Sequence, residues 1–248
     1  MRIDLHADLR GTTTVVTGGA RGLGAEITRK LAGNGSAVWV VDVRERELKQ
    51  LCRELENDDC DVQPLLVDIR DADKVDDAIA TVVQACGSVD VLVNNAAVDV
   101  TKPIEHLSAA EVGLVIGTNL IGSIHMCLAA YRQMVAQQSG HIINILSTAA
   151  NRTWTEAGPY AASKTGLRAF TNTLFKEAQR DCIGVGVTGI LVGGMETPFI
   201  LERFPDADTS MLQDPTIVAD TILSVLAVPA GSVIGELVIV PRNEPSWP

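Results

Sequence analysis

Short runs of apolar, mostly β-branched residues alternate with longer amphipathic segments along the whole chain. The runs lie at 14–16, 38–41, 65–67, 89–93, 141–146, 185–192 and 237–240. Their continuous apolar character is typical of strands that are covered on both faces. Strand–helix alternation of this kind forms right-handed βαβ units. The sequence therefore predicts an α/β protein, a three-layer αβα sandwich around a doubly wound parallel sheet of about seven strands.

The composition favours one soluble domain over residues 1–248. The hydrophobic fraction of 46% supplies a core, and no Gly/Ser-rich linker or internal repeat divides the chain. The net charge of −11 argues against partners such as nucleic acid or an anionic membrane surface. We expect no membrane-spanning run and no signal peptide, so a cytoplasmic protein is predicted.

Cysteines and histidines give no sign of a metal site. The five cysteines are scattered without a CxxC pair, and none of the four histidines lies near another in the spacing of metal ligands. We therefore predict reduced thiols and no metal.

The first apolar run leads directly into a glycine-rich segment, Thr17–Gly24, where a helical pattern begins. Glycines allow a tight turn and let the backbone approach a pyrophosphate, and the free N–H groups at a helix start favour its negative charge. The spacing is GxxxGxG, which alone also fits a plain strand–helix turn. The segment predicts a dinucleotide phosphate site.

Acidic residues close the next two apolar runs. Asp42 can accept hydrogen bonds from an adenosine ribose and would repel the 2′-phosphate of NADP, so it favours NAD. Arg21 and Arg44 leave NADP as the alternative, because an arginine can receive that phosphate. Asp68 is expected beside the adenine, although a plain strand-end residue fits it nearly as well.

A tyrosine and a lysine stand four residues apart in a predicted helix. Tyr160 and Lys164 would share one helix face, one turn from each other. An ammonium beside a phenol favours the phenolate, so we expect the pKa of Tyr160 to fall from about 10 toward neutrality. That would make Tyr160 a general acid/base.

Taken together, these motifs resemble the short-chain dehydrogenase/reductase family, in its single-domain branch, over nearly the full length. The glycine loop at 18–24, Asp42, the Asn94–Asn95–Ala96 segment, Asn119, Ser147, and the pair Tyr160 and Lys164 fall in the family's order. The resemblance implies a Rossmann-like domain. It also implies a cofactor site made by Gly18, Ala20, Arg21, Gly22, Leu23, Asp42, Val43, Asp68, Ile69, Asn95, Ala96, Ala97, Tyr160, Lys164, Gly193 and Thr197.

The resemblance further implies a mechanism, with Asn119, Ser147, Tyr160 and Lys164 as the catalytic set. Hydride would pass between a nicotinamide and a secondary alcohol or ketone, a small-molecule substrate. Tyr160 would exchange the proton, and Lys164 would lower the tyrosine pKa and hold the nicotinamide ribose. Ser147 would hydrogen-bond the substrate oxygen, and Asn119 would hold a water that connects Lys164 to solvent.

Assembly is expected from two apolar stripes on one predicted helix. One stripe contains Ile121, Ile124, Leu128, Tyr131 and Val135, and the other contains Leu120, Cys127 and Met134. A helix that is apolar on two faces is either deeply buried or part of a subunit interface. Because family members commonly form dimers and tetramers, we expect a homodimer or a homotetramer.

Several positions depart from the family pattern. Ala97 replaces a glycine and could crowd the cofactor ribose. Thr188 replaces an asparagine, and Val192 replaces a proline, which could loosen the turn at Gly193. A catalytically dormant NAD-binding regulator or scaffold therefore stays open as an alternative.

The substrate side of the site is less defined by pattern. Residues 198–213 are predicted as a lid or an interface loop. Trp154 fits an apolar wall or a surface or interface position equally well, and Arg152 fits a solvent-facing position better than an anion contact. In the tail, 241–248, Trp247 is expected either in a disordered end or inserted into a neighbouring subunit. The substrate itself stays open.

Overall fold

The computed structural model describes residues 7–58, 60–244 and 247. Within them, one sheet holds seven strands, all parallel, in the order β3-β2-β1-β4-β5-β6-β7. Their bounds are β1 Thr13–Thr17, β2 Ala37–Asp42, β3 Val62–Leu66, β4 Val91–Asn94, β5 Gly140–Ile145, β6 Val185–Val192 and β7 Glu236–Ile239. The predicted fold class is confirmed, and each predicted run overlaps one strand.

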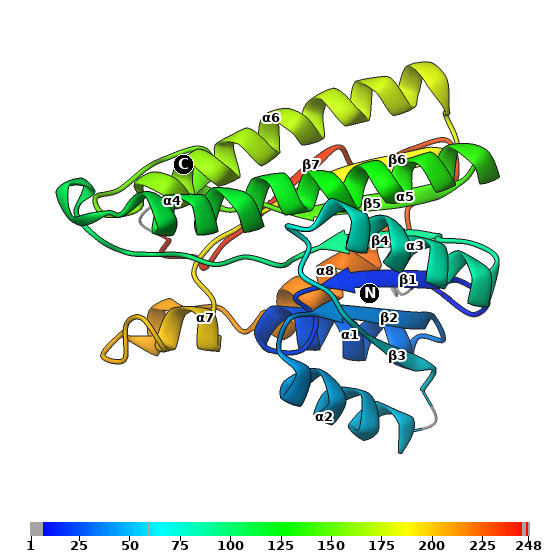
Figure 1. Ribbon diagram of the computed structural model, residues 1–248, viewed down its shortest axis with the longest axis horizontal. Helices are drawn as coiled ribbons and strands as arrows, with labels where there is room; N and C mark the ends of the chain where they lie inside the picture. The colour runs from blue at the N-terminus through cyan, green and yellow to red at the C-terminus, as the bar shows by residue number, and fades with distance from the viewer. Residues whose placement is uncertain (1–6, 59, 245–246, 248) are drawn as a thin grey trace.

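Helices cover both faces of the sheet (Figure 1). One face carries α1 (Gly22–Gly33), α2 (Glu45–Glu56) and α8 (Pro215–Leu226), and the other carries α3 (Ala72–Cys86), α5 (Ser123–Gln137) and α6 (Gly158–Asp181). Shorter helices are α4 (Ala109–Ile116), α7 (Pro198–Leu201), η1 (Ile104–His106), η3 (Thr148–Ala150) and η4 (Thr209–Met211). These layers form the predicted three-layer sandwich.

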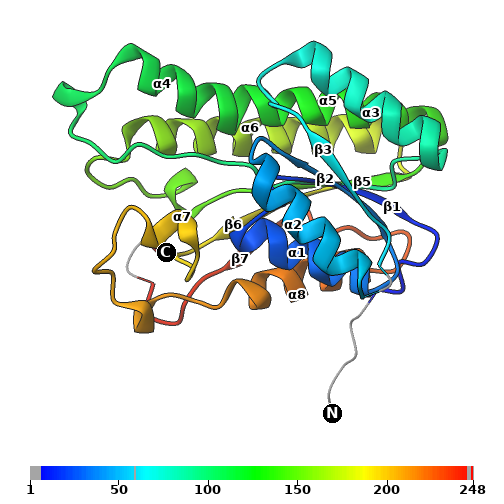
Figure 2. The ribbon, with the colours of Figure 1, turned by 60° about the horizontal axis from the view of Figure 1, so that its bottom comes forward.

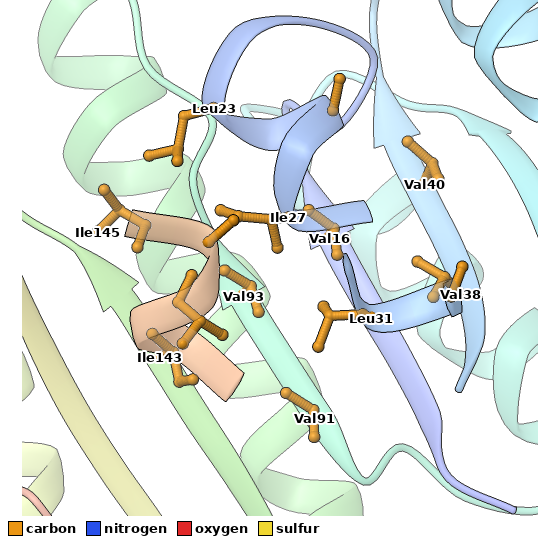
Figure 3. Close-up of a cluster of buried hydrophobic side chains, with 14 of the residues drawn as sticks. Val16, Leu23, Ile27, Leu31, Val38, Val40, Val91, Val93, Ile143 and Ile145 are labelled. Atoms are coloured by element: carbon orange, nitrogen blue, oxygen red, sulfur yellow. The ribbon is translucent and has the colours of Figure 1, made fainter. Parts of the chain in front are cut away.

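Helix α1 shows how the apolar pattern fixes the packing. Leu23, Ile27 and Leu31 recur at helical spacing and point onto the sheet, where they meet buried side chains of β1, β4 and β5 (Figure 3). Ile27 and Leu31 are each only 1% exposed. This packing holds the N-terminal end of α1 directly above the end of β1, which is the position that a phosphate site requires.

Helices α4 and α5 are joined by a π-helical turn, η2 (Gly117–Gly122), into one helical stretch, Ala109–Gln137. This stretch is long and apolar enough to cross a membrane by length and composition alone, a test that core helices of soluble proteins also pass. In the structure Cys127 and Met134 are fully buried, whereas Ile121 and Leu128 are 42% and 40% exposed. The helix thus buries one stripe in the core layer, and the subunit interface stays a prediction.

The strand order creates a switch point between β1 and β4. The chain builds β2 and β3 on one side of β1, and then crosses to place β4 on the other side. The loops after β1 and β4 consequently leave in opposite directions, and they open a crevice at the carboxyl ends of the strands. In Figure 2, α3, α5 and α6 lie above the sheet, and α1, α2 and α8 lie below it.

Candidate active site

The ends of β1 and β4 are joined by four hydrogen bonds. The hydroxyl oxygen of Thr17 accepts from the backbone N–H groups of Asn95 and Ala96, both at 3.1 Å. In return, the Asn95 side-chain amide donates to the carbonyl oxygens of Thr17 at 3.1 Å and Gly18 at 3.0 Å. We call this contact the glycine-loop junction. It fixes the start of the glycine loop to the loop after β4.

Glycines are required at the junction by close backbone approach. Gly18 has φ +61°, and a Cβ there would lie 2.7 Å from the Ala96 Cα atom. A Cβ at Gly24 would lie 2.0 Å from the Gly18 carbonyl oxygen, far inside van der Waals contact. The glycine spacing in the sequence therefore reflects packing as well as access for a phosphate group.

Asp42 ends β2 with its carboxylate held by the backbone. Its two oxygens accept from the N–H groups of Ala20, at 3.1 Å, and Arg44, at 3.0 Å. Only 8% of Asp42 is exposed, so the negative charge is fixed at the edge of the glycine loop. Arg21, in contrast, forms a bidentate ion pair with Glu202, with N···O distances of 2.5 and 2.8 Å.

Arg70, just after the end of β3, is a site residue that the sequence analysis missed. The Asp68 carboxylate accepts from the guanidinium of Arg70, at 2.5 Å from Nη2 and 3.0 Å from Nε, which lowers the Asp68 pKa. Both residues line the cavity described below. The Asp-x-Arg spacing could have indicated this residue, because an aspartate and an arginine two residues apart after a strand can form an ion pair.

Ser147, Tyr160 and Lys164 come together at the carboxyl end of β5. Ser147 precedes η3, where its hydroxyl accepts from the Ala149 N–H at 3.2 Å, and it lies close enough to Tyr160 on α6 to lower the pKa of that phenol. The Lys164 ammonium donates to the Ile145 carbonyl oxygen at 2.9 Å, and its nitrogen lies 5.9 Å from the centre of the Tyr160 ring. All three side chains are buried. The predicted trio is therefore assembled in one place by a strand end and one helix face.

The pKa values differ from the sequence argument. Burial raises the pKa of Tyr160 to about 12, and the neighbouring Ser147 only partly opposes this rise. Burial also lowers the pKa of Lys164 to about 8. The expected fall of the tyrosine pKa does not occur in this structure, because desolvation dominates and the opposing influences come from Ser147 and Arg203. A neutral phenol at pH 7 is a proton donor.

Asn119 lies in the π-helical turn and is fully buried. Its side chain accepts from the Val98 N–H and donates to the Val98 carbonyl oxygen, both at 2.8 Å, and donates to Ser163 at 3.1 Å. Ser163 in turn donates to the Tyr160 carbonyl oxygen at 2.7 Å. The side chain thus joins the loop after β4 to α6, and the proposed water-holding role stays a prediction.

One cavity of about 1030 Å³ collects most of the predicted residues. Ala20 and Asn119 do not line it, although they support it through Asp42 and Val98. Among the described residues, no group of three or more His, Cys, Asp or Glu could hold a metal ion. The lining includes Gly18, Arg21, Gly22, Leu23, Asp42, Val43, Asp68, Ile69, Asn95, Ala96, Ala97, Ser147, Tyr160, Lys164, Gly193 and Thr197.

The segment 198–213 also lines this cavity and is held by Arg203. The Arg203 guanidinium forms an ion pair with Asp99 in the loop after β4, and its Nε donates to the Phe199 carbonyl oxygen at 2.7 Å. It also stacks on the Phe199 ring, 4.2 Å from the ring centre. The Phe199 ring lies 6.0 Å from the Tyr160 ring, so this segment reaches the catalytic tyrosine candidate. Arg152 and Trp154 line the cavity as well.

The tail residue Trp247 packs within its own chain against a cluster that contains the buried residues Leu146, Leu167 and Leu191. This position differs from a disordered end, and insertion into a neighbouring subunit stays a prediction. Residues 245, 246 and 248 lie outside the described residues. The apolar surface around Leu146 explains the contact, and sequence pattern alone could not show that the tail reaches it.

Comparisons with known proteins agree with this architecture. Residues 12–208 match the sequence family described as short chain dehydrogenase. An uncharacterized oxidoreductase of Staphylococcus haemolyticus is 29% identical over 94% of this chain and 99% of its own. A 3beta-hydroxysteroid dehydrogenase 1 of Eggerthella lenta is 33% identical over 82% of this chain and 78% of its own.

A solved structure is also similar. A metagenomic short-chain oxidoreductase in complex with NADP superposes with a TM-score of 0.83 at 28% identity, covering 95% of this chain and 100% of that one. The fold and cavity define a Rossmann-type oxidoreductase. The chain belongs to the short-chain dehydrogenase family.

Proposed function

We propose that the protein transfers hydride between a nicotinamide cofactor and a secondary alcohol or ketone, with Tyr160 as the general acid/base. The observation that carries this proposal is the burial of Ser147, Tyr160 and Lys164 together, with Lys164 one helical turn from Tyr160, in the same cavity as the glycine loop. A small carbonyl compound placed at Ser147 would meet two hydroxyl donors there.

The residues present fit a nicotinamide dinucleotide. Gly22 lines the cavity with φ +54°, a backbone conformation that L side chains rarely adopt, so glycine suits this turn and leaves its backbone open to a phosphate. In the proposal, the glycine loop holds the pyrophosphate, Asp42 the adenosine ribose, and Lys164 the nicotinamide ribose. The cofactor, when bound, supplies the hydride.

The protein's own residues handle the proton. Tyr160, neutral at pH 7, donates its proton to the carbonyl oxygen during reduction, and Ser147 stabilises the charge on that oxygen. Lys164, with its pKa near 8, is mainly protonated at neutral pH and stabilises the phenolate that results.

NAD remains the proposed cofactor, with NADP as the alternative. The buried Asp42 carboxylate would oppose a 2′-phosphate, and the guanidinium of Arg21 is held by Glu202. The alternative draws on Arg44, which lines the cavity, and on the NADP-bound relative. Titration of the purified protein with NADH and NADPH decides between them; tighter NADPH binding would overturn the preference.

The function is tested by Tyr160→Phe, assayed with NADH or NADPH and a panel of ketones. We expect kcat to fall by about 10²- to 10⁴-fold with cofactor affinity nearly intact, because only the proton donor is removed. Tyr131→Phe is the matched control, since it removes the chain's other phenol, whose hydroxyl has no hydrogen-bond partner in the structure. Wild-type turnover in Tyr160→Phe would falsify the assignment.

An inactive wild type that still binds cofactor would favour the dormant alternative. The homo-oligomer and the cytoplasmic location remain predictions.

A further inference from the structure

The turn after β6 consists of two successive glycines, and Val192, just before them, stands where the family pattern has a proline. Gly193 and Gly194 both line the cavity, and β6 ends at Val192 just before them. Glycine has the largest backbone freedom of any residue, so such a turn needs outside contacts to hold one conformation. Val192 is the departure that the sequence suggested would loosen this turn.

The contacts come from β7, from the C-terminal tail and from Gln213, whose N–H donates to the Gly194 carbonyl oxygen at 3.0 Å. The Glu244 carboxylate accepts a hydrogen bond from the Gly194 N–H at 3.0 Å. The Gly193 N–H donates to the Ile239 carbonyl oxygen, also at 3.0 Å. A Cβ at Gly193 would lie 2.5 Å from the Glu244 carboxylate oxygen and 2.8 Å from Pro241, so the tail covers this glycine in direct contact.

The tail is seated behind the catalytic residues. The Glu244 N–H donates to the Pro241 carbonyl oxygen at 3.0 Å, and the Trp247 N–H donates to the Glu244 carbonyl oxygen at 3.3 Å. Trp247 packs against the cluster of Leu146 and Leu167. Leu146 directly precedes Ser147, and Leu167 lies one helical turn beyond Lys164. The anchor of the tail and the catalytic trio therefore share the same strand end and the same helix.

We propose that Glu244 is a positioning residue for the active site. Its carboxylate clamps the Gly193–Gly194 turn, and Trp247 seats the tail that carries it. The clamp holds the cavity wall that the proposed function assigns to the nicotinamide side of the cofactor, so this inference rests on that function. The clamp explains how this cavity wall keeps one conformation although Val192 replaces the proline of the family pattern.

The test separates the hydrogen bond from the charge. Glu244→Gln keeps an oxygen that can accept from Gly194, whereas Glu244→Ala removes it. We expect Glu244→Ala to weaken cofactor binding by roughly tenfold, the size of one charge-assisted hydrogen bond, and Glu244→Gln to stay within about twofold of wild type. Trp247→Ala should resemble Glu244→Ala, and the exposed, nearby Arg242→Ala should bind like wild type.

Hydrogen exchange of the cofactor-free protein gives a readout that does not depend on the proposed function. Peptides covering residues 192–197 should exchange faster in Glu244→Ala than in wild type, while Glu244→Gln leaves them protected. Unchanged exchange in Glu244→Ala would overturn the clamp. Equal loss in Glu244→Gln and Glu244→Ala would also overturn it, since charge would then matter instead of the hydrogen bond. A wild type that binds no cofactor but shows the exchange difference would reject the proposed function and leave the clamp standing.

Discussion

The glycine-loop junction and the segment 198–213 line the same cavity, yet different kinds of contact hold them. The junction is fixed by the hydrogen bonds of Thr17 and Asn95 to the backbone and by backbone groups in direct contact, and a single added carbon at Gly24 would lie 2.0 Å from a carbonyl oxygen. The segment 198–213 has backbone bonds to its surroundings at Gln213, but Glu202 and Arg203 hold it through ion pairs at the tips of long side chains. Close backbone contacts leave no room for adjustment, whereas side-chain tips can move. The junction should therefore be intolerant of change and the segment 198–213 adaptable.

The largest effect is expected at Gly24. Gly24→Ala must displace the Gly18 carbonyl or Asn95, so we predict a loss of about 3 kcal/mol in the free energy of unfolding, together with weaker cofactor binding. Gly33→Ala, in the same helix, meets nothing within 4 Å and should be neutral or stabilising by about 0.5–1 kcal/mol. Denaturant unfolding of both variants measures the contrast. Equal free energies of unfolding for Gly24→Ala and Gly33→Ala would contradict the claim that the junction is intolerant of change.

A smaller, pH-dependent effect is expected at Arg203. Arg203→Ala leaves Asp99 buried without its counter-charge, and burial already raises the Asp99 pKa. When a carboxyl group has a higher pKa in the folded protein than in the unfolded protein, the folded protein loses stability as the pH rises from the unfolded-state pKa through the folded-state pKa. The variant should therefore lose roughly 1–3 kcal/mol at pH 8 and less at pH 5.

Unfolding by denaturant at both pH values tests the Arg203 prediction. Arg180→Ala serves as the control, because it removes an exposed ion pair with the neighbouring Asp181. A cost for Arg203→Ala that is the same at pH 5 and pH 8 would contradict the buried-charge explanation.

The smallest effect is expected at Glu202, whose side chain is 58% exposed. Glu202→Gln should leave stability nearly unchanged, because exposed ion pairs contribute about 0–1 kcal/mol. Loss of the carboxylate frees Arg21, so NADPH affinity should rise by up to about fivefold while NADH affinity stays constant. Glu196→Gln, exposed and outside the cavity lining, is the control for net charge. An equal gain in both variants would sink the idea that Arg21 mediates the effect.

The two regions also differ in what the sequence could predict. The strands, the glycine loop and the position of Tyr160 follow from local patterns, and the structure places them as expected. The pairs Arg203–Asp99 and Glu244–Gly194 join segments far apart in the chain, and no local pattern encodes such a contact. The predicted fall of the Tyr160 pKa was wrong for a related reason, because the degree of burial of a side chain depends on the whole fold.

The π-helical turn at Gly117–Gly122 has a consequence for insertions and deletions. Each residue added to an α-helix rotates everything beyond it by about 100° around the axis. The turn therefore sets the rotation about the helix axis between Val115, which is buried before it, and Met126 and Met134, which are buried after it. A one-residue deletion there would turn the downstream core residues away from the sheet and release the Asn119 contact with Val98. Among related sequences, length changes should accumulate in surface loops and be absent from this turn.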